Sequence, residues 1–281
     1  MIIHQQAGRL QEHLRELRQK GLKTGFVPTM GALHDGHISL VRSALAECDW
    51  VVSSIFVNPT QFNDPKDFAK YPITLGDDLK MLYEAGVGTV FVPTVSEIYP
   101  DGTSIENSFE LGGLDKRIEG RYRPGHFQGV CQVVYRLLEI VEPSVLYMGQ
   151  KDYQQCMVIR KMLLEKNLST RLEICPTIRE SSGLAMSSRN MRLTPEQRKQ
   201  AALIYQVLNG IKSRIAAGRY GALENEAAET LAKAGFKVDY VEIVNAFDLS
   251  AVEDGETNVP LVALAAAFLG EVRLIDNIVM S

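Results

Sequence analysis

Pro28–His37 reads PTMGALHDGH and follows an apolar run, Gly25–Thr29, that has the composition of a short strand. A helix is expected over Ile38–Cys48, directly after His37. The two glycines let a ligand approach the backbone, and the free N–H groups at a helix N-terminus favour phosphate. Two of the five histidines in the chain, His34 and His37, also lie here. The segment therefore predicts a strand–loop–helix unit whose loop contacts a phosphate group.

Short β-branched runs alternate with helical stretches on both sides of this unit, which is typical of a parallel sheet covered by helices. Trp50–Val57 lacks polar alternation, as expected of a strand that is covered on both faces. We predict an α/β fold with a Rossmann-like, doubly wound parallel sheet. The further strands are expected over Thr89–Pro93, Val145–Met148 and Arg171–Ile178, and the further helices over Leu10–Leu17, Leu79–Ala85, Gly129–Val141 and Tyr153–Lys166.

The character of the chain changes near residues 177–192, where a polar stretch leads into a helix start at Thr194–Gln197. Helices are expected to about Ala217 and over Ala222–Ala234, followed by strands over Val238–Val244 and Leu261–Leu269. We therefore predict two domains, a Rossmann-like ligand-binding domain over residues 1–178 and a smaller C-terminal α+β lid domain over residues 179–281.

Composition excludes several classes of protein. The 281 residues are 46% hydrophobic and 23% charged, which is enough for a sizeable core, and 30 Lys and Arg against 34 Asp and Glu give a net charge of −4. No global positive field is present to hold a nucleic acid. The longest apolar run has nine residues, whereas a membrane span needs about 20. The four cysteines show no C-x-x-C spacing and no apolar leader precedes them, so we expect a reduced, cytoplasmic protein.

Four polar clusters each follow a predicted strand: Pro28–His37, Asn58–Asn63, Gly149–Gln155 and Met186–Asn190. The ligand crevice of an open parallel α/β sheet lies at the carboxyl ends of its strands. These clusters are therefore expected to meet in space.

Two features allow more than one interpretation. His34 and His37 can contact phosphate, cap the turn or bind a metal, although zinc would need further ligands that the sequence does not place nearby. The loop Gly112–Gln128 carries several basic residues and is either a solvated surface loop or a wall of the site. Its basic residues are Lys116, Arg117, Arg121, Arg123 and His126.

The clusters also carry a family resemblance. His34–His37 (HDGH) resembles the H-x-G-H signature of the nucleotidyltransferase superfamily, and Met186–Asn190 (MSSRN) resembles a variant of its basic phosphate-binding motif. With Phe56–Phe62 (FVNPTQF) and Gly149–Gln155 (GQKDYQQ) in the same order, the chain resembles the pantoate–β-alanine ligase (pantothenate synthetase) family over essentially its whole length.

The resemblance implies a reaction in two steps. ATP and pantoate give pantoyl adenylate and pyrophosphate, and β-alanine then attacks the acyl carbon to give pantothenate and AMP. It implies a proton-donor role for His37, pantoate binding by Gln61 and Gln155, and contact of Gln61 with β-alanine. The implied ATP contacts are Met30, Gly31, Ala32, Leu33, His34, Asp35, Gly36, His37, Gly149, Gln150, Lys151, Asp152, Ile178, Met186, Ser187, Ser188 and Arg189.

Attack of a carboxylate on ATP builds negative charge on the α-phosphate and the departing pyrophosphate, so catalysis requires preorganised donors. A sufficient set is present in His34, His37, Lys151, Ser187, Ser188 and Arg189. No G-x-S-x-G elbow and no cysteine lies in the four motifs, which agrees with activation of the acid by ATP rather than by a covalent enzyme nucleophile.

Magnesium is expected to arrive with ATP. Asp77 and Asp78 are either its ligands or N-terminal partners of a helix dipole, so the metal ligands are unknown. Asn63–Tyr71 is expected to fold over the crevice and exclude water. The partners are then small molecules, with no nucleic acid and no membrane, and the resemblance implies a homodimer.

The competing functions are an adenylyl transfer that stops at a phosphate ester, a class I aminoacyl-tRNA synthetase and a catalytically silent nucleotide-binding regulator. The negative charge and the short C-terminal part offer no evident tRNA surface. A silent regulator would not need so many phosphate donors.

Overall fold

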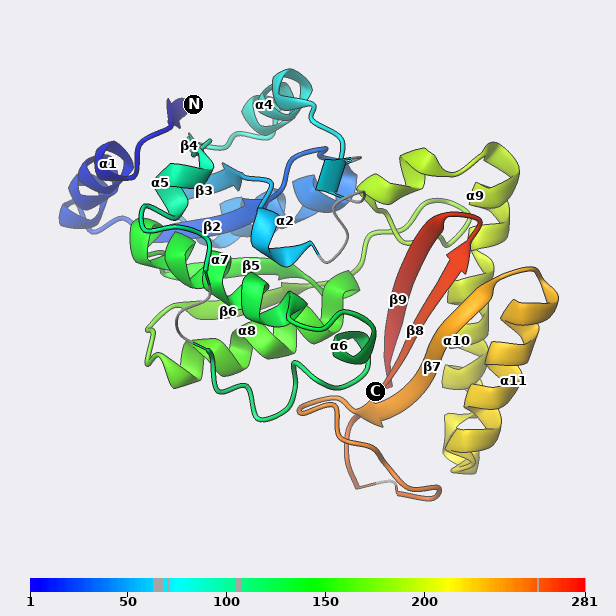
Figure 1. Cartoon of the computed structure of the whole chain (residues 1–281). Coiled ribbons are helices and arrows are strands. Elements are labelled where there is room, and N and C mark those ends of the chain that lie inside the picture. The colour runs from blue at the N-terminus through cyan, green and yellow to red at the C-terminus, as the bar shows by residue number, and fades with distance from the viewer. Residues whose placement is uncertain (63–67, 70, 105–107, 257, 281) are drawn as a thin grey trace.

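The computed structural model describes residues 1–62, 68–69, 71–104, 108–256 and 258–280. A six-stranded sheet forms its larger part, with all strands parallel and in the order β1-β4-β3-β2-β5-β6 (Figure 1). The predicted parallel sheet is confirmed. Its strands are β1 (Ile2–His4), β2 (Thr24–Thr29), β3 (Trp50–Ile55), β4 (Thr89–Phe91), β5 (Val145–Gly149) and β6 (Arg171–Cys175).

Helices cover both faces of this sheet. On β2, Phe26 packs into a core with α1, α7 and α8, while its neighbour Val27 packs into a second core with α2 and α4. Successive side chains of a strand point to opposite faces, so these two cores show that the sheet is doubly wound, as predicted. The helices here are α1 (Ala7–Gln19), α2 (Asp35–Glu47), α4 (Leu75–Glu84), α5 (Val95–Ile98), α6 (Glu119–Tyr122), α7 (His126–Val141) and α8 (Tyr153–Glu165), with short 3₁₀ turns η1 (Pro59–Gln61) and η2 (Gln150–Asp152).

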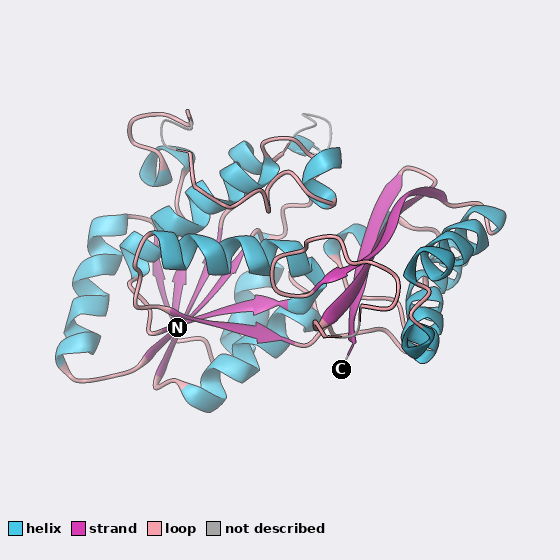
Figure 2. Ribbon diagram, turned by 90° about the horizontal axis from the view of Figure 1, so that it is seen from below, coloured by secondary structure: helices cyan, strands magenta, loops and turns pink. Residues whose placement is uncertain are grey.

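The C-terminal part is an antiparallel sheet of three strands, in the order β7-β8-β9, with α10 and α11 packed on its outer side (Figure 2). The α+β prediction is confirmed. Its elements are η3 (Ser188–Arg192), α9 (Pro195–Ala201), α10 (Leu203–Arg214), η4 (Ile215–Ala217), α11 (Tyr220–Lys233), β7 (Lys237–Asn245), β8 (Leu261–Leu269) and β9 (Val272–Met280).

The two faces of this small sheet belong to different cores. On β8, Ala263 and Ala265 pack with α10 and α11, whereas Val262 and Leu264 join the core that contains α7 and α8. The inner face of the small sheet therefore continues the core of the larger part. Division of the chain at residues 178/179 stays a prediction.

Two strands, β1 and β9, are absent from the sequence prediction. β9 reads VRLIDNIVM. Its Asp276 and Asn277 are residue types that favour turns, so they interrupt a run that otherwise has the composition of a strand. Among the helices that the structure describes, none is long and apolar enough to cross a membrane.

Candidate active site

The candidate site lies where the strand order of the sheet reverses. β2 and β5 are neighbours, with β3 beyond one and β6 beyond the other, and their carboxyl ends lead into the two loops that carry His34 and Lys151. Ligands bind at such switch points in open α/β sheets. A cavity here is lined by fourteen of the predicted site residues: Met30, His34, Gly36, His37, Gln61, Gly149, Lys151, Asp152, Gln155, Ile178, Met186, Ser187, Ser188 and Arg189. The wall does not include Gly31, Ala32, Leu33, Asp35 or Gln150.

A buried carboxylate shapes the first loop. Asp78 in α4 is 1% exposed and accepts hydrogen bonds from the backbone N–H groups of Ala32 at 3.0 Å and Leu33 at 2.8 Å, and from the Thr74 hydroxyl at 3.2 Å. Gly31 has φ of +81°, and a Cβ there would lie 2.9 Å from Asp78 Oδ2. Two loop N–H groups are thus directed at Asp78, and this carboxylate serves as a clamp for the loop.

Asp78→Ala should destabilise the fold, because it leaves two loop donors without a partner at about 1–3 kcal/mol for each buried one. Urea unfolding should show a loss of at least about 2 kcal/mol, whereas Asp77→Ala, at an exposed position one residue away, should stay within about 0.5 kcal/mol. Equal stability of the two variants would contradict the clamp.

The two signature histidines cap α2, which begins at Asp35 rather than after His37 as predicted. His34 Nδ1 accepts from the Gly36 N–H at 3.1 Å, and His37 Nδ1 accepts from the His34 N–H at 3.3 Å. Their ring centroids are 4.1 Å apart. Since each Nδ1 acts as an acceptor, the hydrogen of each neutral ring is on Nε2. Both rings also line the cavity, so capping and contact with a ligand are compatible roles.

Gly36 has no room for a side chain. A Cβ at this position would lie 2.8 Å from two atoms of the His34 ring. The glycine therefore allows the ring to fold back over the start of α2.

The site keeps its histidines neutral. Burial, followed by the charge of Lys151, lowers the pKa of His34 to about 4. Burial, followed by the proximity of His34, lowers the pKa of His37 to about 3. Burial, followed by the charge of Arg123, lowers the pKa of His126 to about 4.

These shifts predict how stability depends on pH. The folded pKa values lie below the unfolded value of 6.5, so unfolding takes up protons below pH 6.5. The free energy of unfolding should be fully retained above about pH 6.5 and should fall as the pH drops toward 4, by up to about 1.4 kcal/mol per pH unit for each histidine. Urea unfolding from pH 8 to 5 measures this effect. In NMR titrations, none of the three rings should titrate near pH 6.5; titration there would contradict the shifts.

Cationic and hydroxyl groups line the same cavity as the histidines. Lys151 in η2 has a side chain 17% exposed, and its Nζ lies 3.5 Å from Asp152 Oδ1. Ser187 Oγ accepts from the Arg189 N–H at 3.3 Å, and the Ser188 hydroxyl donates to the Ala32 carbonyl at 3.1 Å. The segment that starts the C-terminal part is thus hydrogen-bonded to the first loop.

The cavity wall also combines amides with apolar side chains. Gln61 Oε1 accepts from Asn58 Nδ2 at 3.2 Å, and Gln61 Nε2 lies 3.0 Å from the sulfur of Met30. Gln155 in α8 also lines the cavity. The apolar wall comes from Val130, Val133, Val134 and Leu137 of α7. A small ligand with polar groups and methyl groups fits this lining.

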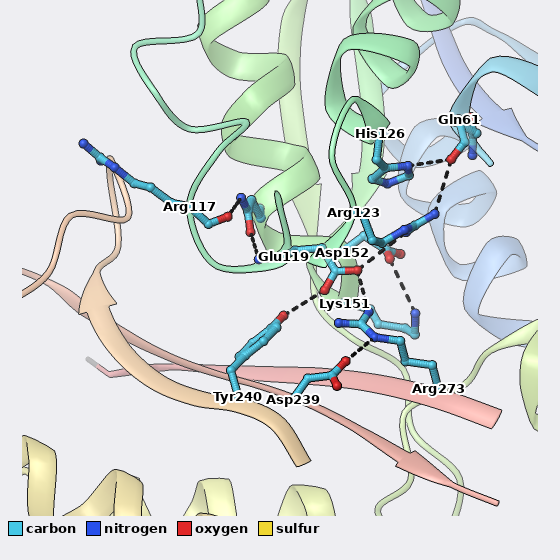
Figure 3. Close-up of polar contacts among 11 residues, drawn as sticks. Gln61, Arg117, Glu119, Arg123, His126, Lys151, Asp152, Asp239, Tyr240 and Arg273 are labelled. Atoms are coloured by element: carbon cyan, nitrogen blue, oxygen red, sulfur yellow. Dashed lines mark hydrogen bonds and ion pairs between the residues drawn. The ribbon is translucent and has the colours of Figure 1, made fainter. Parts of the chain in front are cut away.

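Some basic residues of the loop Gly112–Gln128 line the cavity, and others lie away from it. Arg123 and His126 line the cavity, and both donate to the Gln61 carbonyl, at 3.3 Å from Arg123 Nη2 and 2.7 Å from His126 Nδ1 (Figure 3). Arg117 and Arg121 instead contact the C-terminal part, through the Asp248 carbonyl and Glu242. Lys116 is not part of the cavity wall.

Arg123 also leads into a polar network that joins the two parts of the chain (Figure 3). Glu119 Oε1 lies 3.6 Å from Arg123 Nη1 and accepts from Arg273 Nη1 at 2.6 Å, while Arg273 Nε donates to Asp239 at 2.7 Å. The Tyr240 hydroxyl donates to Glu119 Oε2 at 3.1 Å. Burial alone would raise the pKa of Glu119, but Arg273 and Arg123 hold it below its usual range. The ionised network therefore links Arg123 of the cavity wall to the small C-terminal sheet.

Several wall residues were not singled out from the sequence. Asn58 lies in the FVNPTQF motif without a predicted role, and Thr177 also lines the cavity. Tyr71, the last residue of the expected lid, lines it as well. Of the expected lid Asn63–Tyr71, residues 63–67 and 70 lie outside the described part of the chain, while the ring centroids of Phe68 and Tyr71 lie 5.3 and 5.8 Å from that of Phe62. Proximity in the fold, rather than any local pattern, brings these residues to the site.

The described carboxylates nearest the first loop and Lys151 are engaged by other groups. In the described ranges of the chain, no group of three or more His, Cys, Asp or Glu residues is arranged to hold an ion. Asp78 accepts from backbone N–H groups, and Asp152 faces Lys151.

The sheet, its switch point and the cavity define an α/β enzyme of the class that binds its ligands at the carboxyl ends of parallel strands. Comparison with known proteins narrows this class. Residues 2–279 match the model of the pantoate-beta-alanine ligase family, and the chain belongs to that family of ligases.

The relatives agree over nearly the whole chain. Pantothenate synthetase of Cytophaga hutchinsonii is 46% identical over 274 residues, with 96% of each chain covered, and that of Bacteroides thetaiotaomicron is 44% identical over 272 residues, with 96% and 95% covered. The crystal structure of pantothenate synthetase from Thermus thermophilus matches with a TM-score of 0.90 at 40% identity and 99% coverage of both chains. Pantoate-beta-alanine ligase from Francisella tularensis, complexed with beta-gamma ATP and beta-alanine, matches with a TM-score of 0.83 at 38% identity, covering 100% of this chain and 98% of that one.

Proposed function

We propose that this protein uses ATP to condense (R)-pantoate with β-alanine to pantothenate, through a pantoyl-adenylate intermediate. AMP and pyrophosphate are the other products. Family membership and the ligands in the Francisella tularensis complex support the proposal. The observation that carries it is a single cavity whose wall contains both phosphate donors and an amide and apolar lining.

In the first step, a pantoate carboxylate oxygen attacks the α-phosphorus, and the bond from that phosphorus to the bridging oxygen of pyrophosphate breaks. Negative charge grows on the α-phosphate and on the leaving group, where preorganised donors act best. We assign this role to the ammonium of Lys151, the guanidinium of Arg189, the Nε2–H groups of His34 and His37 and the hydroxyls of Ser187 and Ser188. The proposed ATP contacts are those implied by the family resemblance.

The neutral state of His37 refines the proton-donor role implied by the family. An imidazole ring with a pKa of about 3 is neutral at pH 7 and carries one N–H hydrogen, which here is on Nε2. We propose that His37 stabilises the α-phosphate by a hydrogen bond rather than by giving up a proton.

Pantoate fits the part of the cavity wall formed by Gln61, Gln155 and α7. Its hydroxyls require amide donors and acceptors, which Gln61 and Gln155 supply, and its two methyl groups require an apolar surface, which α7 supplies. Gln61 would also contact β-alanine.

In the second step, the β-alanine amine attacks the acyl carbon and AMP leaves. The chain does not need to supply a covalent nucleophile, since the adenylate already activates the acid. The four cysteines are free and buried, and burial raises the pKa of Cys131 and Cys156, so these two thiols stay protonated.

Three further proposals accompany this function. Mg²⁺ arrives with ATP, held by phosphates and water, and neutralises phosphate charge. The domain formed by residues 1–178 binds nucleotide and pantoate, and that formed by residues 179–281 closes over ATP. The protein acts as a homodimer in the cytoplasm.

The test is pantoate-dependent exchange of labelled pyrophosphate into ATP by the purified protein with Mg²⁺, first without and then with β-alanine. Exchange without amine, followed by AMP and pantothenate once β-alanine is added, is the expected result. Folded protein that binds ATP but stays silent in both conditions would overturn the proposal. Transfer of the AMP group to a phosphate ester, with no amine-dependent release of AMP, would instead favour simple adenylyl transfer.

A further inference from the structure

Asn277 of β9 lies in the C-terminal sheet, yet its side chain is engaged by the η2 loop between β5 and α8. It is 2% exposed. Its Nδ2 donates to the carbonyls of Gln150 and Lys151, both at 2.9 Å, and its Oδ1 accepts from Gln150 Nε2 at 3.3 Å. One buried amide therefore makes three hydrogen bonds to two consecutive residues of a loop that is far away in the sequence.

Among nearby side chains, the Cys156 thiol donates to the Gly149 carbonyl at 3.4 Å but does not reach Gln150 or Lys151. η2 and α8 both begin without a side-chain hydrogen bond from their N-cap residues, Gly149 and Asp152. The Asn277 amide thus supplies an anchor that the local sequence lacks. Because Asn277 donates a hydrogen bond to the carbonyl of Lys151 itself, it fixes the backbone from which the Lys151 ammonium extends into the cavity.

The neighbouring residue acts on a second loop. Asp276 accepts from Arg179 through both oxygens, at 2.5 and 3.0 Å, and its Oδ1 also accepts from the Asn277 N–H at 2.8 Å. Arg179 follows Ile178, whose carbonyl accepts from the Met186 N–H at 3.0 Å. Consecutive strand side chains point to opposite faces, so the two residues reach separate loops of the cavity from one point of β9.

We propose that Asn277 is a positioning residue for the phosphate site: it sets the place of Lys151 from the C-terminal sheet. It does not line the cavity and acts through the loop that it holds. The kinetic test of this inference rests on the proposed function. The binding test requires only that the protein binds ATP.

Asn277→Leu, of similar volume but without the amide, should raise the Kd for a non-hydrolysable ATP analogue about tenfold, because the loop loses its donor. Pantoate affinity should change less than twofold, since Gln61 and the α7 wall do not depend on this anchor. Gln155 lies in α8, which is held by its own core contacts. Asn277→Asp keeps the shape of the side chain but loses the amide donor, so it should raise the Kd for the ATP analogue to a similar extent. It takes the place of the leucine variant if that variant does not fold. The control is Ile243→Ala in β7, which opens a cavity in the core on the opposite face of the small sheet and should lower the Tm without changing ATP affinity.

A double-mutant cycle on the exchange rate tests whether the effect passes through Lys151. Asn277→Leu should slow exchange about tenfold in the otherwise unchanged protein, but less than about twofold in a Lys151→Ala background, because contributions through one group are not additive. An equal slowing in both backgrounds, or unchanged ATP affinity in folded Asn277 variants, would overturn the inference. If the unchanged protein catalyses no exchange, the proposed function fails, and the ATP Kd values still decide the role of Asn277.

Discussion

Lys151→Ala is expected to slow pantoate-dependent pyrophosphate exchange by about 100- to 1000-fold, by analogy with removal of one preorganised oxyanion donor. Lys151 lies at the carboxyl end of β5, its side chain is 17% exposed, and it lines the cavity with both signature histidines. The full charge of an ammonium in such a site stabilises phosphate oxygens most when charge develops on them. The loss should therefore lie mainly in kcat, as measured by exchange at saturating ATP.

The matched control is Lys161→Ala, at an exposed position of α8 away from the site. It should leave kcat within about twofold and stability within about 0.5 kcal/mol, as is usual for exposed positions. Lys151→Ala should lose far less stability than activity. A Lys151→Ala protein that loses stability as severely as it loses activity would identify a structural lysine instead.

His37→Ala should slow exchange by about 100-fold, because it removes an Nε2–H donor from the α-phosphate. It also removes the Nδ1 acceptor that caps the His34 N–H. His37→Gln restores both: glutamine at the third position of a helix accepts the N-cap N–H in a capping box, and its amide also offers N–H donors.

The glutamine variant distinguishes two roles for the ring. If His37 acts as a neutral hydrogen-bond donor, His37→Gln should recover at least about tenfold of the roughly 100-fold loss. Steady-state exchange rates at neutral pH measure this. A glutamine variant as slow as the alanine variant would show that the imidazole must transfer a proton, and it would contradict the neutral role inferred from the low pKa.

Much of the fold can be predicted because its signals are local. Trp50–Ile55, which shows no polar alternation, and the unbroken apolar run Leu261–Leu269 mark buried strands. Thr194–Gln197 forms the capping box that its sequence suggests. Helix starts are less certain, since α2 begins at Asp35 with His34 as its cap, a role that lies outside the usual set of Ser, Thr, Asp and Asn.

Convergence of the site is predictable for the same reason: polar clusters at the carboxyl ends of parallel strands must share one edge of the sheet. Fourteen predicted residues line one cavity. Long-range partners leave no such signal. Asp78 reaches back to Ala32 from another helix, and Asn277 reaches Lys151 from a strand that turn-type residues concealed. Such contacts depend on packing, which local patterns do not encode.

Attack of the pantoate carboxylate on the α-phosphorus of ATP is tested most directly by following an oxygen atom. Pantoate with an ¹⁸O-labelled carboxylate is incubated with ATP, Mg²⁺, β-alanine and the purified protein, and the AMP and pyrophosphate are analysed by mass spectrometry. The account predicts that one labelled oxygen appears in AMP and none in pyrophosphate, because the acyl–oxygen bond of the adenylate breaks when the amine attacks. Unlabelled AMP, with label in inorganic phosphate or retained wholly in pantoate, would contradict it.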